Sequence, residues 1–316
     1  MAGVMIVNLP SSASPLRIGT RGSPLALAQA YETRDRLAKA HDLPLDAFEI
    51  VVITTTGDRV QDRPLKELGG KGLFTREIET ALSEGGIDIA VHSMKDMPVD
   101  QPGGLVLDTY LPREDVRDAL LGSSPRIADL PQGATVGTSS IRRRAQLQLR
   151  RPDLKVVEFR GSVQTRLKKL ADGVAEATFL ASAGLNRLGM DVGAVPLDPD
   201  EMLPAVAQGA IGIERRQADT RTADLLSAIH HGETGQRLAA ERAFLAALDG
   251  SCQTPIAGLA ELSGDQLHLR GEILRIDGSD AVADKITGPI ADGAEMGRTL
   301  AKTLVDRAGP GFLVID

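Results

Sequence analysis

The sequence predicts an α/β protein of two hinged, doubly wound lobes and a small C-terminal α+β domain. Strand-like and helix-like segments alternate in two successive sets, which is typical of open sheets covered by helices. A strand-like segment at 211–214 follows the second set and is expected to return to the first lobe, so that two crossings form a hinge. The last part of the chain groups three strand-like segments before a helix. We expect lobe 1 over 15–112 with 206–229, lobe 2 over 113–205 and a C-terminal domain over 230–316.

The composition narrows the class of protein. The chain of 316 residues has a formal net charge of −7, and aromatic residues make up 3% with no Trp. This charge argues against a general nucleic-acid or membrane-surface role, and the lack of aromatic residues argues against base stacking. One Cys excludes an internal disulfide, the N-terminus lacks the basic start of a signal peptide, and no apolar stretch is long enough to span a membrane. We expect a cytoplasmic protein.

Lobe 1 is expected to begin with a strand over Leu16–Arg21. A helix should start at Pro24, because Ser23 is a favoured N-cap and Pro suits the first helical position. Arg21 and Ser23 therefore lie at a strand-to-helix turn, where free backbone N–H groups favour an anion. A solvated Arg21 without a ligand is the alternative.

The next segments complete the expected first lobe. Phe48–Thr54 is rich in β-branched residues, which favours a central strand. The charged, glycine-rich stretch Arg59–Gly72 is expected to form a mobile cover loop. An apolar stripe from Leu73 to Leu82 then predicts a helix that leads into the next strand.

A polar cluster follows the strand expected over Ile87–Val91. Ser93, Lys95 and Asp96 come directly after it, and Pro98 prevents the strand from continuing. In an open α/β sheet, side chains just beyond the carboxyl end of a strand face the ligand crevice. A carboxylate beside an ammonium group there could stabilise charge or transfer a proton. A surface turn with an incidental ion pair remains the alternative.

Lobe 2 is expected to repeat this pattern. Strands are predicted over Ala134–Gly137, Lys155–Arg160 and Ala177–Ala181, and Ser140 and Ser162 are predicted to cap the helices that follow the first two. The segment Leu111–Asp115 before them is expected to cross between the lobes.

Positive charge is concentrated in this lobe. Between Gly137 and Leu170 there are ten basic residues and two acidic ones, and Arg142, Arg160 and Arg187 fall near strand ends or helix starts. Guanidinium groups bind carboxylates with two parallel hydrogen bonds, so the cluster predicts a ligand with several carboxylates or phosphates. A solvated basic face, or RNA binding, is the alternative.

The C-terminal part is expected to contain the only thiol in a loop. Cys252 lies among small polar residues in Asp249–Pro255, which bury a side chain poorly and would leave a thiol free to react. A small buried hydrophobic side chain, the commonest role of a free Cys, is the alternative. His230 and His231 lack the spacing of metal ligands and are interpreted as structural. The expected helices and strands around these residues are, in chain order, helices over Asp219–Ile229 and Glu233–Leu248, strands over Ile256–Leu262, Leu267–Leu274 and Ala281–Ile286, and a helix over Met296–Ala308.

Six short motifs, in order, give the chain a resemblance to a known family. They are Thr20-Arg21-Gly22-Ser23-Pro24-Leu25-Ala26, Gly69-Gly70-Lys71-Gly72-Leu73-Phe74, Val91-His92-Ser93-Met94-Lys95-Asp96, Gly137-Thr138-Ser139-Ser140-Ile141-Arg142-Arg143, Pro204-Ala205-Val206-Ala207-Gln208-Gly209 and Gly250-Ser251-Cys252-Gln253. With them, the chain resembles the porphobilinogen deaminase (hydroxymethylbilane synthase) family from about residue 16 to the C-terminus. Any one motif would be weak, but six in order are very specific.

The resemblance implies an activity. Members are transferases that join four porphobilinogen molecules head to tail, with loss of ammonia, into hydroxymethylbilane for haem and related tetrapyrroles. They start from a dipyrromethane cofactor held as a thioether on a Cys, which by motif is Cys252. No metal is implied.

The resemblance also implies the site residues. Asp96 is the catalytic carboxylate, assisted by Lys95. The cofactor-binding residues are Cys252, Ser23, Ser93, Lys95, Ser140, Arg142, Arg143 and Arg166. The substrate-binding residues are Arg21, Ser23, Arg160, Arg166, Arg187 and Gln208. Lys71 and Phe74 belong to the cover loop.

Two positions depart from the family pattern. Ser162 replaces the usual Asn after an Arg-Gly pair, a mild change between N-capping residues, and Glu67 stands where Lys is frequent in the cover loop. The rival from another class is a two-lobed anion-binding or sensor protein, because periplasmic binding proteins share the hinged architecture. Such a protein needs no single loop thiol and no Asp at the closure point.

Overall fold

The computed structural model describes residues 9–59, 72, 74–250 and 254–313. The chain folds into two compact units. Unit 1 takes in the chain up to Pro112 together with Ala210–Gly235, and unit 2 takes in Arg113–Gly209 together with the chain from Gln236 onward. Unit 2 thus holds the predicted lobe 2 and C-terminal segment together, and the three predicted domain boundaries stay a prediction.

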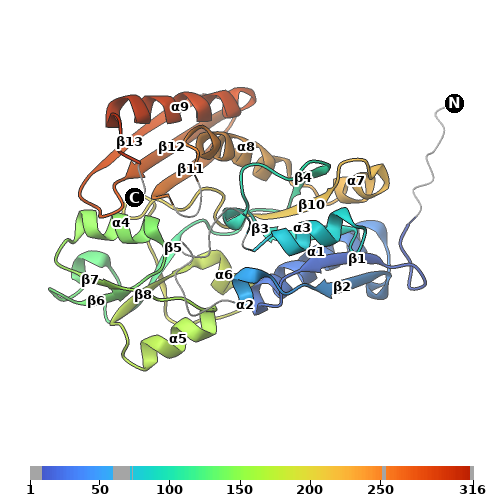
Figure 1. Ribbon diagram of the computed structural model, residues 1–316, viewed down its shortest axis with the longest axis horizontal. Helices are drawn as coiled ribbons and strands as arrows, with labels where there is room; N and C mark the ends of the chain where they lie inside the picture. The colour runs from blue at the N-terminus through green and yellow to red at the C-terminus, as the bar shows by residue number, and fades with distance from the viewer. Residues whose placement is uncertain (1–8, 60–71, 73, 251–253, 314–316) are drawn as a thin grey trace. The chain divides into compact units, whose positions relative to one another are not determined.

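Unit 1 contains a five-stranded sheet in the order β2-β1-β3-β10-β4 (Figure 1). Its strands are β1 (Leu16–Thr20), β2 (Phe48–Val52), β3 (Ile89–Ser93), β4 (Leu105–Tyr110) and β10 (Ile211–Arg216). β1 is parallel to β2 and β3, whereas β10 pairs antiparallel with both β3 and β4. The late strand therefore returns to the first sheet, which confirms that prediction.

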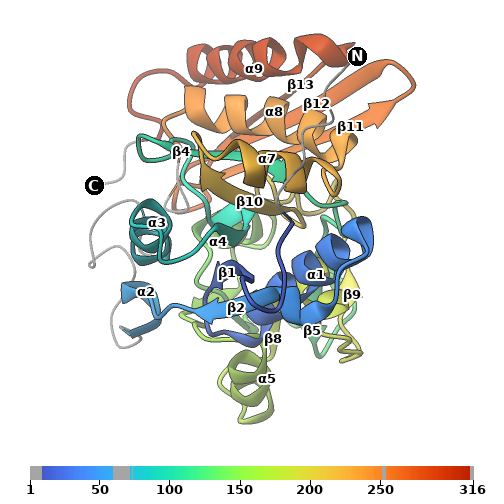
Figure 2. The same cartoon turned by 90° about the vertical axis from the view of Figure 1, so that its right-hand side faces the viewer.

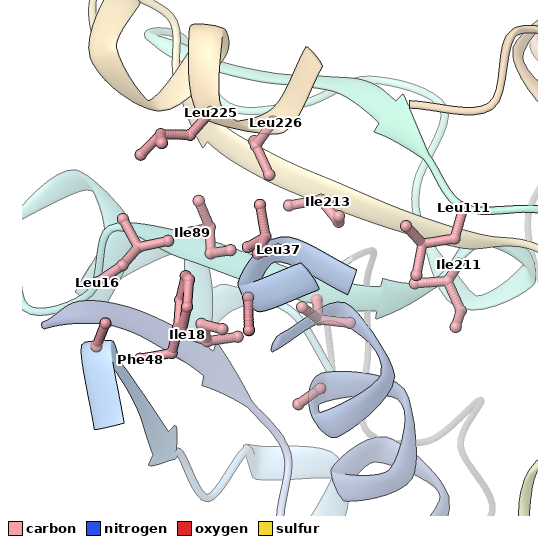
Figure 3. Close-up of a cluster of buried hydrophobic side chains, with 14 residues drawn as sticks. Leu16, Ile18, Leu37, Phe48, Ile89, Leu111, Ile211, Ile213, Leu225 and Leu226 are labelled. Carbon is pink, nitrogen blue, oxygen red and sulfur yellow. The ribbon is translucent and has the colours of Figure 1, made fainter. Parts of the chain in front are cut away.

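Helices cover both faces of this sheet. The helical segments of unit 1 are α1 (Pro24–His41), η1 (Leu45–Ala47), α2 (Thr56–Arg59), α3 (Arg76–Ser83), η3 (Met94–Asp96) and α7 (Thr220–Ser227). On one face, Ile18, Ile89 and Ile213 pack with Leu37 of α1 and Leu226 of α7 (Figure 3). On the other face, the next residues along the strands pack against α3. This alternation follows from the period of two along a strand.

The start of α1 agrees with its sequence signal. The Ser23 side chain accepts a hydrogen bond from the Ala26 N–H at 3.3 Å, and Pro24 occupies the first helical turn. The prediction of a central strand at Phe48–Thr54 is wrong. Among the described strands β2 pairs only with β1, and Val52 is 53% exposed. β-Branched residues suit a pleated surface and do not specify an inner or outer position.

Unit 2 contains a second five-stranded sheet in the order β7-β6-β8-β5-β9. Its strands are β5 (Asp118–Gly122), β6 (Thr135–Gly137), β7 (Lys155–Val157), β8 (Ala177–Ala181) and β9 (Val195–Pro196). The predicted strand over Lys155–Arg160 stops at Val157. Strands β5 and β9 were not predicted, and β5 lies between β8 and β9 and runs antiparallel to both.

Helices cover this sheet on both faces as well. The helical segments are η4 (Ile127–Asp129), α4 (Ile141–Arg150), α5 (Val163–Ala171) and α6 (Ser182–Arg187). Leu147 of α4 packs with Leu120 and Phe179 on one face. Leu185 of α6 and Leu167 of α5 pack with neighbouring strand residues on the other. Ser140 and Ser162 cap α4 and α5 as predicted, each accepting a hydrogen bond from a backbone N–H three residues on.

The end of unit 2 is an antiparallel sheet in the order β11-β12-β13 with two long helices beside it (Figure 2). Its elements are α8 (Gly232–Ala247), β11 (Ile256–Ser263), β12 (Gln266–Leu274), β13 (Ala281–Pro289), η5 (Ile290–Asp292) and α9 (Gly293–Ala308). A Cβ at Gly271 of β12 would lie 2.6 Å from the Phe244 ring of α8, so this helix packs closely on the sheet. The predicted α+β composition is confirmed. Among the described helices, none is both long and apolar enough to cross a membrane.

Candidate functional site

In unit 1, the predicted catalytic segment forms the end of β3 and the 3₁₀ turn after it. Ser93 is the last residue of β3, and its hydroxyl lies 2.8 Å from Gln29 Nε2 on α1. Met94 is 1% exposed and anchors the turn in the core. Lys95 is half-buried and Asp96 is exposed. The local fold therefore fixes the backbone through Ser93 and Met94 while it leaves the Asp96 carboxylate accessible.

A buried ionisable pair lies on the strand before this turn. His92 Nε2 is 3.1 Å from Glu214 Oε2 on the neighbouring β10, and the two side chains are 5% and 0% exposed. Burial raises the pKa of nearby Glu79, and the negative charge of Glu214 adds to this effect. The sequence did not indicate this cluster, because Glu214 on β10 lies 122 residues after His92.

Two predicted residues, Arg21 and Phe74, lie together in unit 1. The Arg21 guanidinium carbon is 4.3 Å from the centre of the Phe74 ring, and the same guanidinium forms an ion pair with Asp58. Asp58 also accepts a 2.7 Å hydrogen bond from the Thr55 hydroxyl. Burial alone would raise the pKa of Asp58, but Arg21 and Thr55 outweigh it and lower the pKa below its usual range. Arg21 is therefore held in place by residues of this chain, and its binding of an anion stays a prediction.

In unit 2, one buried carboxylate joins three predicted ligand residues. Asp118, the first residue of β5, is 0% exposed and was not predicted. Arg143 donates to Asp118 Oδ1 from Nη2 at 2.7 Å and from Nε at 3.1 Å. Arg142 Nη2 lies 2.8 Å from Asp118 Oδ2, and Gln208 Nε2 donates to Oδ1 at 2.9 Å.

The charges in this cluster do not cancel. Burial alone would raise the pKa of Asp118, but the positive charges of Arg142 and Arg143 outweigh it and leave the pKa far below its usual range. Burial lowers the pKa of Arg142, and Asp118 opposes this shift. With the carboxylate ionised and both guanidiniums protonated, these three groups carry one net positive charge. Arg142 Nε is buried and has no hydrogen-bond partner among the described residues.

The other predicted arginines occupy different places in unit 2. Arg187 at the end of α6 donates to the Gly209 carbonyl at 3.0 Å. Arg166 on α5 donates from Nε to the Gly161 carbonyl at 3.0 Å. Arg160 is half-buried, as is Ser140. These residues belong to one unit, and among the described residues the Asp118 carboxylate joins Arg142, Arg143 and Gln208.

Several predictions lie outside the described residues. Cys252, Lys71 and Glu67 are among them, so the structure gives no position for the expected cofactor thiol or for most of the cover loop. His230 and His231 are hydrogen-bonded to Tyr110 and Thr234, which agrees with a structural role. Within 9–59, 72, 74–250 and 254–313 there is no group of three or more His, Cys, Asp or Glu side chains suited to a metal.

These features define a class of protein: two α/β sheets, an exposed carboxylate after a strand of the first, and a buried guanidinium pair in the second. Family models refine it. A model described as "Porphobilinogen deaminase, dipyromethane cofactor binding domain" matches residues 16–224, and one described as "Porphobilinogen deaminase, C-terminal domain" matches residues 236–306. A curated porphobilinogen deaminase from Paracoccus denitrificans (strain Pd 1222) is 68% identical over 309 residues, covering 97% of this chain and 99% of the relative. The chain belongs to the porphobilinogen deaminase family.

Solved structures of other proteins show a weaker likeness. The periplasmic VFT2 domain of Bordetella pertussis BvgS is 18% identical over 72% of this chain and 91% of its own, with a TM-score of 0.39. The methionine-binding protein MetQ is 15% identical over 70% of this chain and 89% of its own, with a TM-score of 0.39. With scores this low, the fold assignment depends on the two sheets themselves.

The described residues fit the cofactor of this family. Dipyrromethane carries acetate and propionate groups, which are anions at neutral pH. Together with Asp118, the buried guanidinium pair of Arg142 and Arg143 carries one net positive charge. The Nε–H of Arg142 has no partner among the described residues, and a carboxylate oxygen suits such a donor. Arg142 and Arg143 could therefore hold one carboxylate of such a group.

Proposed function

We propose that the chain joins four porphobilinogen molecules head to tail, with loss of ammonia, to give hydroxymethylbilane, and that Asp96 is its catalytic residue. Family membership supports the transferase activity and the dipyrromethane cofactor. The structural observation that supports the proposal most directly is the Arg142–Arg143 pair, in which the buried Nε–H of Arg142 has no hydrogen-bond partner among the described residues. A ligand with several carboxylates supplies such acceptors.

Asp96 acts on the substrate's aminomethyl group. In its protonated form, the exposed Asp96 carboxyl group donates a proton to the nitrogen of that group, and the C–N bond breaks to release ammonia. The carboxylate that remains stabilises the cation left on the substrate, and it accepts the ring proton released after the new bond forms, which restores the protonated form. Lys95 supplies a neighbouring positive charge for a ligand carboxylate.

The remaining proposed residues bind and orient carboxylates. Ser23, at the N-terminus of α1, and Ser93, at the end of β3, offer hydroxyl groups. Arg21 binds substrate, and Phe74 holds its guanidinium plane in place. In unit 2, Arg160, Arg166 and Arg187 serve the substrate, while Ser140, Arg142, Arg143 and Arg166 serve the cofactor. Lys71 completes the proposed cover loop.

Cys252 is the proposed attachment point of the cofactor. It is the only thiol in the sequence, so a thioether has one possible site. When bound, dipyrromethane supplies the pyrrole end to which the first substrate is joined. We also propose that the protein acts in the cytoplasm as a monomer and that it needs no metal ion and no nucleic acid.

An intact-mass measurement tests this proposal. The purified wild-type chain should exceed the mass of its polypeptide by two pyrrole units and should turn red with an acidic aldehyde reagent. Cys252→Ser should lose the added mass and nearly all activity, because an oxygen nucleophile does not replace a thiolate well. Ser251→Ala, one position away, is the matched control and should keep both. A wild-type chain with the bare mass and full activity would contradict the proposal.

A further inference from the structure

Asp118 lies behind the proposed ligand arginines. Its side chain is 0% exposed, whereas those of Arg142 and Arg143 are 6% and 5% exposed, so the two arginines keep a small accessible surface and Asp118 has none. Arg143 is held at a third point, where Nη1 donates to the Phe179 carbonyl at 2.9 Å. Arg142 is held at a second point, where Nη1 donates to the Leu203 carbonyl at 2.8 Å. Each guanidinium plane is thereby fixed before any ligand arrives.

Gln208 is also held through this carboxylate. Its Nε2 donates to Asp118 Oδ1 at 2.9 Å and to the Val116 carbonyl at 2.8 Å, and the residue is 1% exposed. Both Nε2 hydrogens point into unit 2. The geometry therefore places the Gln208 amide beside Asp118, and the expected contact of Gln208 with the substrate stays a prediction.

We propose that Asp118 is a positioning residue of this enzyme, which orients Arg142 and Arg143 for ligand carboxylates and is in turn oriented by Gln208. The inference rests on the proposed function, because that function makes the two arginines ligand-binding. A guanidinium held in advance at two or more points loses little further freedom when a carboxylate binds.

The charge balance supports the same role. Without Asp118, the two guanidiniums would be buried without the carboxylate that contacts both of them, which is strongly unfavourable. Glu272 is a second acidic group that acts on Arg142, but burial raises the pKa of Glu272, which favours its neutral form, and the positive charge of Arg150 acts on it as well. Asp118 is therefore the anion that holds the pair, and positive charge remains for a ligand to neutralise.

Asp118→Asn separates positioning from simple charge. The variant keeps the size of the side chain but loses the acceptor strength that fixes both guanidiniums. If Asp118 positions them, the fraction of protein that carries dipyrromethane should fall and KM for porphobilinogen should rise roughly 10- to 100-fold, as for other misplaced binding groups. The kcat per loaded molecule should change little. If charge alone mattered, removing an anion would lower KM, and that result would overturn the proposal.

Asp153→Asn is the matched control. Asp153 is also bonded to an arginine in the same unit, with 2.8 Å between its Oδ1 and Arg151 Nε, but this pair lies at the surface. It should match the wild type in loading and KM. A merely structural Asp118 would lower the melting temperature while the folded protein kept normal loading and KM, and this outcome would also reject the inference.

A second variant keeps the test decisive. Gln208→Met removes the donor to Asp118 without changing any charge, and it should raise KM several-fold with kcat retained. If Gln208 acts through Asp118, the double variant Asp118→Asn/Gln208→Met should have a KM no higher than Asp118→Asn alone, whereas additive effects on KM would indicate a direct ligand contact of Gln208.

If Asp118→Asn fails to fold, unchanged loading and KM in Gln208→Met would still overturn the proposal. A wild-type chain without dipyrromethane would defeat the proposed function, whereas normal loading in both variants defeats only this inference.

Discussion

Arg113 and Glu241 form a buried, two-point ion pair that ties the chain segment next to unit 1 to helix α8. Arg113 Nη1 lies 2.7 Å from Glu241 Oε1, and Arg113 Nη2 lies 3.0 Å from Oε2. The side chains are 4% and 0% exposed. Glu241 also accepts the N–H groups of Ala207 at 2.6 Å and of Ala260 on β11 at 2.8 Å. Four donors from three parts of unit 2 therefore meet at one carboxylate.

Glu241→Gln should destabilise the protein strongly. The change leaves the Arg113 guanidinium buried without its counter-charge, which typically costs about 3–5 kcal/mol when one partner of a buried pair is removed. It also weakens the bond to Ala207, whose backbone has a φ of 61° that L-residues rarely adopt. Urea unfolding followed by circular dichroism measures the loss.

Glu295→Gln is the control for this prediction. Glu295 pairs with Arg298 at 2.7 Å, but both side chains are more than half exposed. An exposed pair contributes at most about 1 kcal/mol. Equal losses of unfolding free energy in the two variants would show that the buried Arg113–Glu241 pair stabilises the protein no more than an exposed pair does.

Local signals in the sequence predicted local structure well. Ser23, Ser140 and Ser162 each cap the helix expected after them, because an N-cap bond depends only on neighbouring residues. The close approach at Gly137, by contrast, depends on a residue far along the chain, since a Cβ there would lie 2.4 Å from the ring of Phe159.

Long-range partners could not be predicted in this way. The count of charges from Gly137 to Leu170 described a strongly basic region, but Asp118 lies outside it and is brought to Arg142 and Arg143 by strand β5. β5 itself was missed, because five residues after a charged crossing segment give no clear period. The only indication in the sequence was that one acidic residue, Asp118, directly precedes the apolar run Ala119-Leu120-Leu121. The pairing of β10 set the position of Glu214 against His92 in the same way.

Acid should weaken the protein through Asp118. Its pKa in the folded state is well below the ordinary value of 3.8, because Arg142 and Arg143 outweigh the effect of burial. Below pH 3.8 the unfolded carboxyl is protonated while the folded one stays ionised, so unfolding takes up a proton and stability falls as pH falls. This contribution is fully present above that pH and is lost as pH falls toward the folded pKa.

Unfolding free energies of the wild type and Asp118→Asn at several pH values test this sign. The gap between them should be widest near pH 7 and should narrow below pH 4, at up to about 1.4 kcal/mol per pH unit for one group. A gap that stays constant from pH 7 to pH 3 would contradict the assigned direction.

Arg166→Leu should impair cofactor loading as well as turnover. If the same guanidinium serves both the cofactor and the substrate, its loss leaves a ligand carboxylate unpaired at a cost of roughly 2–5 kcal/mol. Arg160→Leu should raise KM by a similar mechanism. Intact mass gives the loaded fraction, and steady-state kinetics give KM.

Arg144→Leu is the control for both variants. Arg144 is an exposed arginine on α4 in the same unit, and its replacement should leave loading and kinetics like those of the wild type. Normal loading and kinetics in the Arg160 and Arg166 variants would mean that these side chains form only a solvated basic face.

Asp96→Asn should stop the chemistry while binding survives. The carboxylate is exposed at the end of a turn anchored by Met94, so the substitution keeps the shape and should leave stability within about 1 kcal/mol of the wild type. General acid–base catalysis contributes about 10²–10⁴-fold, and loss of the charge that stabilises the cation should add to this. Cys252 and the arginines are unchanged, so the variant should still acquire its cofactor or a stalled pyrrole chain. The defect should therefore appear in kcat and not in KM.

Single-turnover measurement of ammonia release distinguishes this catalytic role from an incidental surface carboxylate. Asp100→Asn, an exposed acid four residues on, is the control and should release ammonia at the wild-type rate. Near-normal ammonia release by Asp96→Asn would remove Asp96 from the catalytic mechanism.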